Sequence, residues 1–174
     1  MATFLKGALF GIFLASQIFA KEAVFVLPYD NKQALKELKS SIKNAKNSVD
    51  IAIYSFTHKD IAKSIREAAK QGVKVRIIYD KSQLDSKFST IGNLSAIRNI
   101  NTCVLRGIGS GNISGIMHQK LLIIDGSKIA FGSANWSKNA FTNNYEILYF
   151  TDNAKLASKI NSSFREMWRA CKPY

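Results

Sequence analysis

The sequence predicts an α/β fold in which a mixed, largely parallel β-sheet is sandwiched between helices. Apolar, β-branched runs alternate with amphipathic helical patterns along the chain, which is the pattern of a sheet covered on both faces. The run Val73–Tyr79 is apolar enough to be a central parallel strand. A length of 174 residues suffices for one domain with a substantial core. We therefore expect a single domain over residues 21–174, preceded by a separate segment at 1–20.

The first half of the domain follows a strand–helix–strand–helix–strand order. The first helix begins at Asp30 or Asn31, and the second begins at Thr57 or His58 and ends at Gly72. The predicted strands are Ala23–Leu27, Val49–Phe56 and Val73–Tyr79. The apolar stripes of the two helices are Leu35, Leu38, Ile42 and Ala45, then Ile61, Ile65, Ala68 and Ala69.

The second half begins less regularly and ends in a long helix. The predicted elements are a short helix at Leu94–Ile97, strands at Thr102–Leu105 and Asn144–Phe150, a short helix at Ser137–Phe141 and a long helix from about Asn153 to Arg169. The glycine-rich stretch Gly107–Gly115 lacks the Gly-Lys-Ser/Thr ending and following helix of a phosphate-cradling loop. It is either a mobile flap or a plain connector.

The first twenty residues have the composition of a secretory signal. Lys6 precedes the apolar run 7–15, and Ile18-Phe19-Ala20 resembles a cleavage site. The run is short for a membrane span, which needs about 20 residues. We expect export to the periplasm or the medium. The alternative is an uncleaved N-terminal anchor, which would associate the protein with a membrane.

The charge of the chain is strongly one-sided, because 25 Lys and Arg face 12 Asp and Glu and the net charge is +13. Such an excess predicts a polyanionic partner, since each neutralised phosphate releases a counterion. Nucleic acid is the favoured partner, with anionic lipid second. The alternative is solvated helix faces. The basic residues considered include Lys39, Lys43, Lys46, Lys59, Lys63, Arg66, Lys70, Lys74 and Arg76.

The two cysteines, Cys103 and Cys171, permit one disulfide. In an oxidising compartment they could pair and close a long loop, worth about 4 kcal/mol in the chain-entropy model. The alternative is two buried thiols. Two cysteines and two histidines, widely scattered, do not form a metal-ligand pattern, so we expect no metal and no other cofactor.

A predicted hairpin carries the polar residues that look functional. Asp125-Gly126 between two β-rich runs favours a two-residue turn with positive φ at both positions. That register pairs Ile124 with Ser127 and places His118 opposite Ser133. Alternation then puts Lys120 and Asn135 on the same strand face. The sequence therefore predicts a phosphate-sized site made of His118, Lys120, Ser133 and Asn135.

Asp125 cannot belong to that site in its own chain. It lies seven residues from His118, which is roughly 23 Å along a strand. We interpret Asp125 as a structural turn residue that sets the hairpin register.

The ordered string of His118, Lys120, Asp125, Gly132, Ser133 and Asn135 resembles the HKD signature of the phospholipase D superfamily. The runs 49–56 and 71–80 also resemble the strand–helix–strand lead-in of that family, and the likeness covers nearly all of residues 24–170. The short chain, with one HKD half, is most similar to the small bacterial endonucleases of this type. The resemblance implies a phospholipase D-like fold and assigns Asp125 and Gly132 structural places in the motif.

The family resemblance also implies a mechanism without metal. One His118 attacks phosphorus to form a phosphohistidine, while a second His118 protonates the leaving oxygen. Lys120 and Asn135 hold the non-bridging oxygens of the bound nucleic acid, and Ser133 adds a hydrogen bond. Single-motif members dimerise, so the resemblance implies a homodimer with the site at its two-fold interface. Its products should carry 5′-phosphates.

Three further residues have two interpretations each. Glu146 interrupts an apolar run, so it is either a partner that orients His118, as in similar enzymes, or an edge-strand carboxylate facing water. Trp136 could stack on a base, but a core position is commoner. His58 could be a catalytic partner, but it lies at a predicted helix start, where a capping or solvated histidine is the ordinary case.

These observations support three function classes. The leading hypothesis is an exported, metal-independent, non-specific endonuclease of DNA or RNA, with single strands among its candidate substrates. The second is a phospholipase D-type lipid phosphodiesterase, which the small size disfavours. The third is a non-catalytic nucleic-acid-binding protein of DNA uptake, which gives no reason for His118 and Lys120 to share a strand face.

Overall fold

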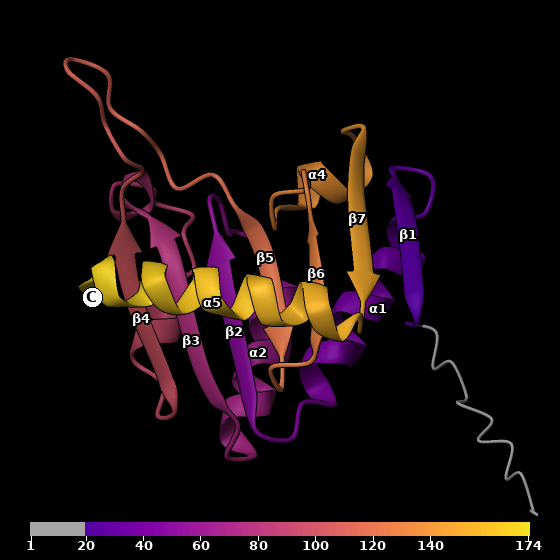
Figure 1. Cartoon of the computed structure of the whole chain (residues 1–174). Coiled ribbons are helices and arrows are strands. Elements are labelled where there is room, and N and C mark those ends of the chain that lie inside the picture. Colours follow the sequence, from indigo (N-terminus) through magenta and orange to yellow (C-terminus); the bar gives the residue numbers. More distant parts are fainter. Residues whose placement is uncertain (1–19) are drawn as a thin grey trace, which may run out of the picture.

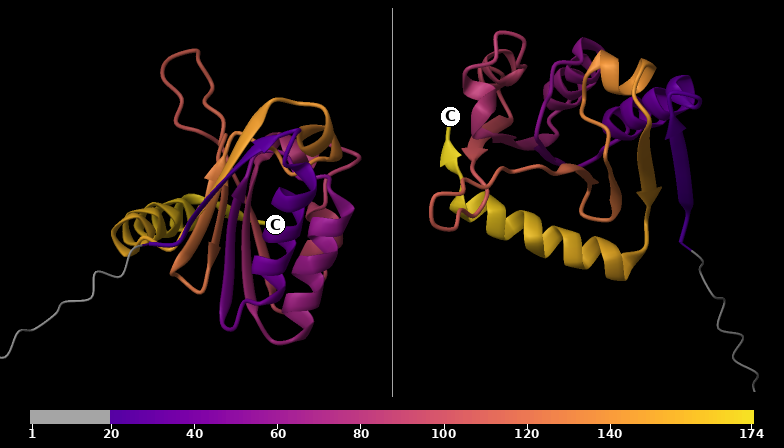
Figure 2. Two further views of the ribbon diagram at one scale, coloured as in Figure 1. Left: turned by 90° about the vertical axis from the view of Figure 1, so that its right-hand side faces the viewer. Right: turned by 90° about the horizontal axis from the view of Figure 1, so that it is seen from above.

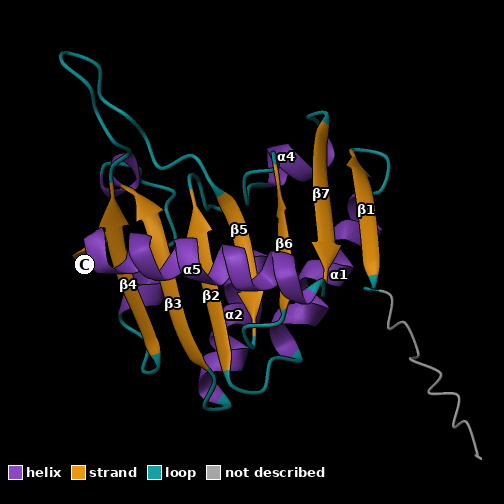
Figure 3. Cartoon of the chain, viewed as in Figure 1, coloured by secondary structure: helices purple, strands orange, loops and turns teal. Residues whose placement is uncertain are grey.

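An eight-stranded sheet lies between two helical layers in the computed structural model, which describes residues 20–174. The strand order is β1-β7-β6-β5-β2-β3-β4-β8 (Figure 3). Helices α1 and α2 cover one face of the sheet, and α5 crosses the other (Figures 1 and 2). Apart from its last residue, the predicted signal segment 1–20 lies outside the described residues. No helix within residues 20–174 is long and apolar enough to cross a bilayer.

Every helix and strand predicted from the sequence is present, with boundaries that differ by a few residues. The strands are Glu22–Leu27 (β1), Ser48–Ile53 (β2), Lys74–Asp80 (β3), Ile100–Leu105 (β4), Lys120–Ile124 (β5), Lys128–Gly132 (β6), Glu146–Thr151 (β7) and Lys172–Pro173 (β8). The helices are Asn31–Lys43 (α1), Lys59–Lys70 (α2), Ile91–Ser95 (α3), Lys138–Thr142 (α4) and Ala154–Ala170 (α5), with a 3₁₀ turn at Lys81–Leu84. Strand β8 and the 3₁₀ turn were not predicted, because two to four residues carry no periodicity.

The predicted α/β sandwich is confirmed, but the prediction that its sheet is largely parallel is wrong. Within the described residues, β2 pairs in parallel with β3 and β3 with β4, while the other five neighbouring pairs are antiparallel. Parallel neighbours need crossover connections, whereas β5 and β6 form a hairpin and β7 returns from the same edge at which β6 ends. An apolar run indicates burial and does not encode strand direction.

Two apolar layers hold the sandwich together. The larger layer joins the sheet to α1 and α2 and includes Leu38, Ile65 and Phe56, all fully buried. The smaller layer joins the sheet to α5 and includes Ile129 and Phe164. These layers fix the strand ends that carry the polar residues described below.

Arg76 is committed to the α5 layer and is not free to bind a polyanion. Its Nε and Nη2 donate to the Asp50 carboxylate at 2.7 and 2.6 Å. Its guanidinium also lies 5.1 Å from the Phe164 ring centroid and 5.5 Å from that of Trp168. The hydrogen bond to Asp50 raises the pKa of Arg76, although its burial opposes this. Arg76 therefore does not contribute to a surface that could attract nucleic acid.

Cys103 and Cys171 form a disulfide with a Cα–Cα distance of 5.8 Å. Cys103 belongs to β4, and Cys171 directly follows α5. The bond thus fastens the C-terminal end of α5 to the sheet, where β8 also pairs with β4.

Candidate active site

The ends of five neighbouring strands form part of one edge of the sheet, and we call this part the site edge. Strands β1, β2 and β6 end there, and β5 and β7 begin there (upper edge of the sheet in Figure 1). Tyr54 directly follows β2, His118 precedes β5, Ser133 follows β6 and Glu146 begins β7. Polar side chains are tolerated at strand ends, because there they can reach solvent or one another.

His118 and Lys120 both contact the aromatic ring of Tyr54 at the site edge. The ring centroids of His118 and Tyr54 are 4.6 Å apart, and the Lys120 Nζ lies 5.0 Å from the Tyr54 centroid. Lys120 Nζ also donates to the His118 backbone carbonyl at 2.8 Å. The His118 side chain is exposed and has no hydrogen bond to the described residues. Its imidazole is therefore free to meet a ligand.

Tyr54 is the residue of this cluster that sequence reasoning missed. Its backbone N–H donates to the Gln119 carbonyl at 2.9 Å, which holds the end of β2 beside the start of β5. The available signal was its position, because a polar aromatic residue directly follows the apolar run of β2. The sequence could not show which other strand would be its neighbour.

Lys120 is an ammonium group with little access to water, since only 4% of the residue is exposed. Burial lowers the pKa of Lys120, because desolvation disfavours the charged form, and the nearby Glu146 carboxylate partly opposes the shift. A cation held in such surroundings acts strongly on an adjacent anion, because water screens it less.

Glu146 is held by neutral partners within its own chain. Ser133 Oγ donates to Glu146 Oε2, and Asn144 Nδ2 donates to Glu146 Oε1 at 3.2 Å. Ser133 Oγ also accepts from the Ile147 N–H at 3.1 Å. The predicted contact between Glu146 and His118 is absent among the described residues of one chain. The edge-strand interpretation is wrong as well, because β7 lies between β1 and β6.

Asn135 is not hydrogen-bonded to this group among the described residues. Its Oδ1 is buried and lacks a hydrogen-bond partner among the described residues. The next residue, Trp136, donates its N–H to the Ser55 carbonyl at 3.0 Å. Trp136 is 2% exposed and packs edge-on against Phe56, so it is a core residue and does not stack on a base.

The predicted hairpin register is wrong by one residue. Asp125 and Gly126 do adopt positive φ, and Ser127 N–H donates to the Ile124 carbonyl to close the turn. The ladder, however, pairs Ile124 with Lys128, so Ser127 is an additional loop residue. The predicted pairing of His118 with Ser133 does not occur. Ser133 reaches the site through β7 instead, where it binds Glu146.

Asp125 has the structural place predicted for it. Its carboxylate accepts the backbone N–H groups of Lys46, Asn47 and Ser48 at 2.9, 2.7 and 2.9 Å. Burial would raise the pKa of Asp125, but these three hydrogen bonds together outweigh it and hold the pKa below its ordinary value. The carboxylate ties the β5–β6 turn to the segment that enters β2.

Gly132 is required by the closeness of β7. A Cβ at this position would lie 1.9 Å from the Ile147 carbonyl oxygen, far inside any contact distance. Glycine therefore lets β6 approach β7 closely enough for Ser133 to bind Glu146.

The glycine-rich loop before His118 is a protruding hairpin (Figure 1). Gly107 N–H donates to the Gly115 carbonyl at 3.2 Å, and Ser110 and Ile113 exchange two backbone hydrogen bonds at 3.0 Å. Neither Gly107 nor Gly115 has room for a Cβ, so the base of the hairpin is closely packed. Ile108, which follows Gly107 in this hairpin, is fully exposed.

His58 does not belong to the site. It precedes α2, its ring packs against Phe141 at 5.7 Å, and burial lowers its pKa. Within residues 20–174, no three His, Cys, Asp or Glu side chains are grouped so that they could hold a metal ion.

Comparison with known proteins agrees with this geometry. Residues 38–168 match the family described as "Cardiolipin synthase, PLD-like domain". NucT from Helicobacter pylori is 47% identical, with a TM-score of 0.87 over 90% of this chain and 100% of that chain. Nuc from Salmonella typhimurium, a phospholipase D family member, is 29% identical, with a TM-score of 0.74 over 90% of this chain and 99% of that chain.

The chain is also similar to a longer curated protein, of which it spans only part. The mitochondrial cardiolipin hydrolase of Danio rerio is 27% identical over 146 residues. The alignment covers 84% of this chain, which spans about three fifths (62%) of the relative. The family match includes Tyr54, His118, Lys120, Ser133 and Glu146.

Proposed function

Because this chain belongs to the phospholipase D superfamily, we propose that it is a phosphodiesterase that hydrolyses nucleic acid as a metal-independent, non-specific endonuclease. One observation carries the proposal. The exposed imidazole of His118 and the nearly buried ammonium of Lys120 both lie against the Tyr54 ring at the site edge. The pair supplies a nucleophile and a fixed positive charge, which are what an anionic phosphodiester needs.

The proposed reaction has two displacement steps. An imidazole nitrogen of one His118 attacks phosphorus, the P–O bond to the leaving group breaks, and a second His118 gives its proton to the leaving oxygen. That second His118 then takes a proton from water, whose oxygen attacks phosphorus and breaks the P–N bond. Lys120 and Asn135 contact the non-bridging oxygens and stabilise the charge that develops on them. Asn135 would do so through its Nδ2 group, because an amide oxygen is an acceptor and cannot bind a phosphate oxygen.

The second His118 is proposed to come from a two-fold-related copy, since the chain offers one histidine at the site edge. An exposed apolar patch beside the site supports a second copy there. Its residues are Val24, Val26, Tyr29, Tyr145 and Ile147. Val26 and Ile147 are cross-strand partners, and the Tyr29 and Tyr145 rings are 6.2 Å apart. A contiguous apolar patch of this kind typically marks a protein interface.

The dimer is tested by placing a charge in that patch. We expect Ile147→Lys to give a monomer in sedimentation analysis and to reduce activity in parallel. The matched control is Leu84→Lys, because Leu84 is also an exposed apolar residue, 41% against 52% for Ile147, and is far from it in sequence. An active monomeric Ile147→Lys protein would contradict the shared site.

Nucleic acid is the proposed substrate because of the net charge of +13 and the absence of any base-reading motif that would restrict sequence. A lipid phosphodiesterase is the second candidate. It is favoured by the likeness to a cardiolipin hydrolase and by Ile108 and Ile113, which are 100% and 76% exposed on the hairpin that leads to His118. We also propose that residues 1–20 direct export, and a fusion of these residues to a periplasmic reporter would test this.

The deciding experiment incubates the full chain with plasmid, single-stranded DNA, RNA and cardiolipin vesicles in excess EDTA. His118→Ala is the control, and its exposed position predicts an unchanged melting temperature. Degradation of nucleic acid by the wild type alone is the expected result. Release of lipid headgroups with intact nucleic acid would establish the second candidate, and inactivity of both proteins on all four substrates would overturn the phosphodiesterase proposal.

A further inference from the structure

Helices α1 and α2 carry identical patterns of basic residues. Basic residues occur at the first, fifth, eighth and twelfth positions of a twelve-residue stretch in each helix. They are Lys32, Lys36, Lys39 and Lys43 in α1, and Lys59, Lys63, Arg66 and Lys70 in α2. Spacings of four, three and four residues keep side chains on one face of a helix. No basic residue of either helix lies outside these positions. We call the eight side chains the basic stripes.

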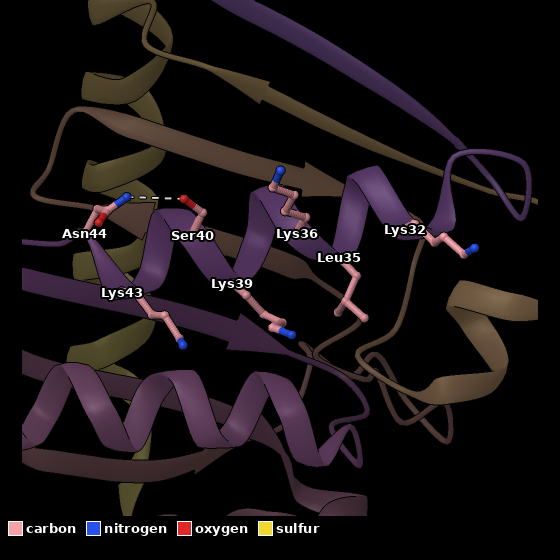
Figure 4. Close-up of a pocket in the computed structure, with 7 residues that line it drawn as sticks. All are labelled: Lys32, Leu35, Lys36, Lys39, Ser40, Lys43 and Asn44. Atoms are coloured by element: carbon pink, nitrogen blue, oxygen red, sulfur yellow. Dashed lines mark hydrogen bonds between the residues drawn. The ribbon is translucent and has the colours of Figure 1, made fainter.

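The basic stripes face solvent side by side. The inner faces of α1 and α2 are buried against the sheet, and the two helices pack against each other (Figure 2). Seven of the eight stripe residues are exposed, and Lys39 is half-buried. Figure 4 shows Lys39 and Lys43 pointing from α1 toward the neighbouring helix, while Lys36, on the same face of α1, points away from that helix. A surface hollow of about 440 Å³ is lined by all four α1 lysines.

Acidic residues neutralise only part of this surface, although Asp60 and Glu67 lie on α2 among its basic residues. Lys43 pairs with Glu67 at 2.9 Å, and no other stripe residue has an ion pair among the described residues. Glu37 of α1 is engaged elsewhere, with Lys128 at 2.7 Å. Unpaired like charges on adjacent helices repel one another, which is a cost that a bound polyanion removes.

The basic stripes begin near the site edge. The chain enters α2 through Thr57 and His58, whose N–H groups donate to the Trp136 carbonyl at 2.9 and 2.8 Å, one residue after Asn135. Helix α1 starts after β1, whose last residue Leu27 pairs with Glu146. A second hollow of about 590 Å³ bridges the two helix starts and is lined by Lys32, Lys59 and Lys138. From there each stripe extends about 16 Å along its helix, given the rise of 1.5 Å per residue.

We propose that the basic stripes bind the sugar–phosphate backbone of a polynucleotide whose scissile bond occupies the site edge. This inference rests on the proposed nuclease function and adds a second, sequence-independent contact region to it. A lipid surface fits less well, because membrane-binding helices set apolar side chains beside their basic ones. The exposed large apolar residues of residues 20–174 include none from α1 or α2.

The test compares two fourfold variants with the same loss of charge. The stripe variant is K36Q/K39Q/K63Q/R66Q, and the control is K155Q/K159Q/R165Q/R169Q, which removes four exposed basic residues from α5. Binding to a fluorescent 30-nucleotide strand is measured against salt in the His118→Ala background. We expect the stripe variant to bind roughly tenfold or more weakly, with a salt slope lower by about 2–3, because single strands give about 0.7 per phosphate contact. The control variant should change less in both respects.

Equal losses in the two variants would overturn the inference, because net charge alone would then explain binding. Retained DNA binding in the stripe variant with lost binding to cardiolipin vesicles would overturn it in favour of a membrane surface. The fourfold variants with His118 intact are also assayed on bis(4-nitrophenyl) phosphate, which is too small to reach the stripes. Hydrolysis of this ester at the wild-type rate is expected. A wild-type chain that binds the strand through the stripes but cannot cleave either substrate would refute the proposed function, and only the binding role of the stripes would stand.

Discussion

The two ends of the β5–β6 hairpin differ in how their polar groups are satisfied. At the turn, the Asp125 carboxylate accepts three backbone N–H groups. At the site edge, the His118 side chain has no hydrogen bond among the described residues, and Asn135 Oδ1 is buried without a partner. Satisfied polar groups stabilise a fold, and unsatisfied ones are available to a ligand. The comparison indicates that one motif serves stability at one end and chemistry at the other.

The largest effect is expected for Lys120→Met, which should reduce activity at the site edge without reducing the stability of the fold. Removing the cation should lower the turnover rate about 100- to 1000-fold, which is the usual effect of losing one group that stabilises transition-state charge. Stability should not fall, because methionine keeps the buried stem and relieves the cost of a desolvated ammonium. Steady-state kinetics and thermal melting check both statements. A large fall in melting temperature would place Lys120 with the structural residues.

Gly132→Ala should affect stability and activity together. The added Cβ would meet the Ile147 carbonyl, so β6 and β7 must separate at a cost of about 3 kcal/mol. Because Ser133 follows directly, its bond to Glu146 should also be disturbed. Urea unfolding measures the first effect, and the matched control is Gly92→Ala, whose Cβ would meet only Tyr174 Oη at 3.8 Å. A stable Gly132→Ala protein would contradict the close approach of the strands.

Asp125→Asn should reduce stability and leave the activity of the folded molecules unchanged. Hydrogen bonds to a charged group are stronger than neutral ones, so we expect a loss of about 2 kcal/mol. The lowered pKa of Asp125 gives the sign of the pH dependence. Its contribution is present above the ordinary pKa of an aspartate and is lost as the pH falls through the lowered value.

Urea unfolding between pH 2 and 7 tests this prediction. The acid-induced loss of stability should be smaller in Asp125→Asn than in the wild type. Asp85→Asn is the control, since Asp85 is exposed and its carboxylate has no hydrogen bond among the described residues. A reduced turnover rate in folded Asp125→Asn would contradict the conclusion that the turn end of the hairpin serves stability alone.

The smallest expected effect is a shift, in Glu146→Gln, of the pH at which activity declines on the alkaline side of the pH profile. The pKa of Lys120 is lowered by burial and partly restored by the Glu146 charge. Without that charge the Lys120 pKa should fall further, so the proton should be lost, and activity should decline, at a lower pH than in the wild type. Meanwhile stability should rise with pH across this range, because the unfolded chain still binds the Lys120 proton. If activity declined at the same alkaline pH in Glu146→Gln as in the wild type, a group other than Lys120 would control that decline.

Residues that are close in the sequence were predicted well. The helices and strands, the positive φ of Asp125 and Gly126, the structural place of Asp125 and the membership of His118 and Lys120 in one site all follow from local patterns. Periodicity, turn chemistry and an ordered motif are local properties, so one sequence is sufficient to find them.

The pairing of distant segments was decided by the tertiary structure. The mostly antiparallel sheet and the contact of Ser133 with Glu146 depend on which strands become neighbours. Tyr54 joins the site for the same reason, because β5 pairs with β2 across more than sixty residues of chain. The sequence by itself determined the elements and the polar residues of the motif. Only the packing of the sheet determined which side chains meet, because side chains in long-range contact have no fixed spacing in the sequence.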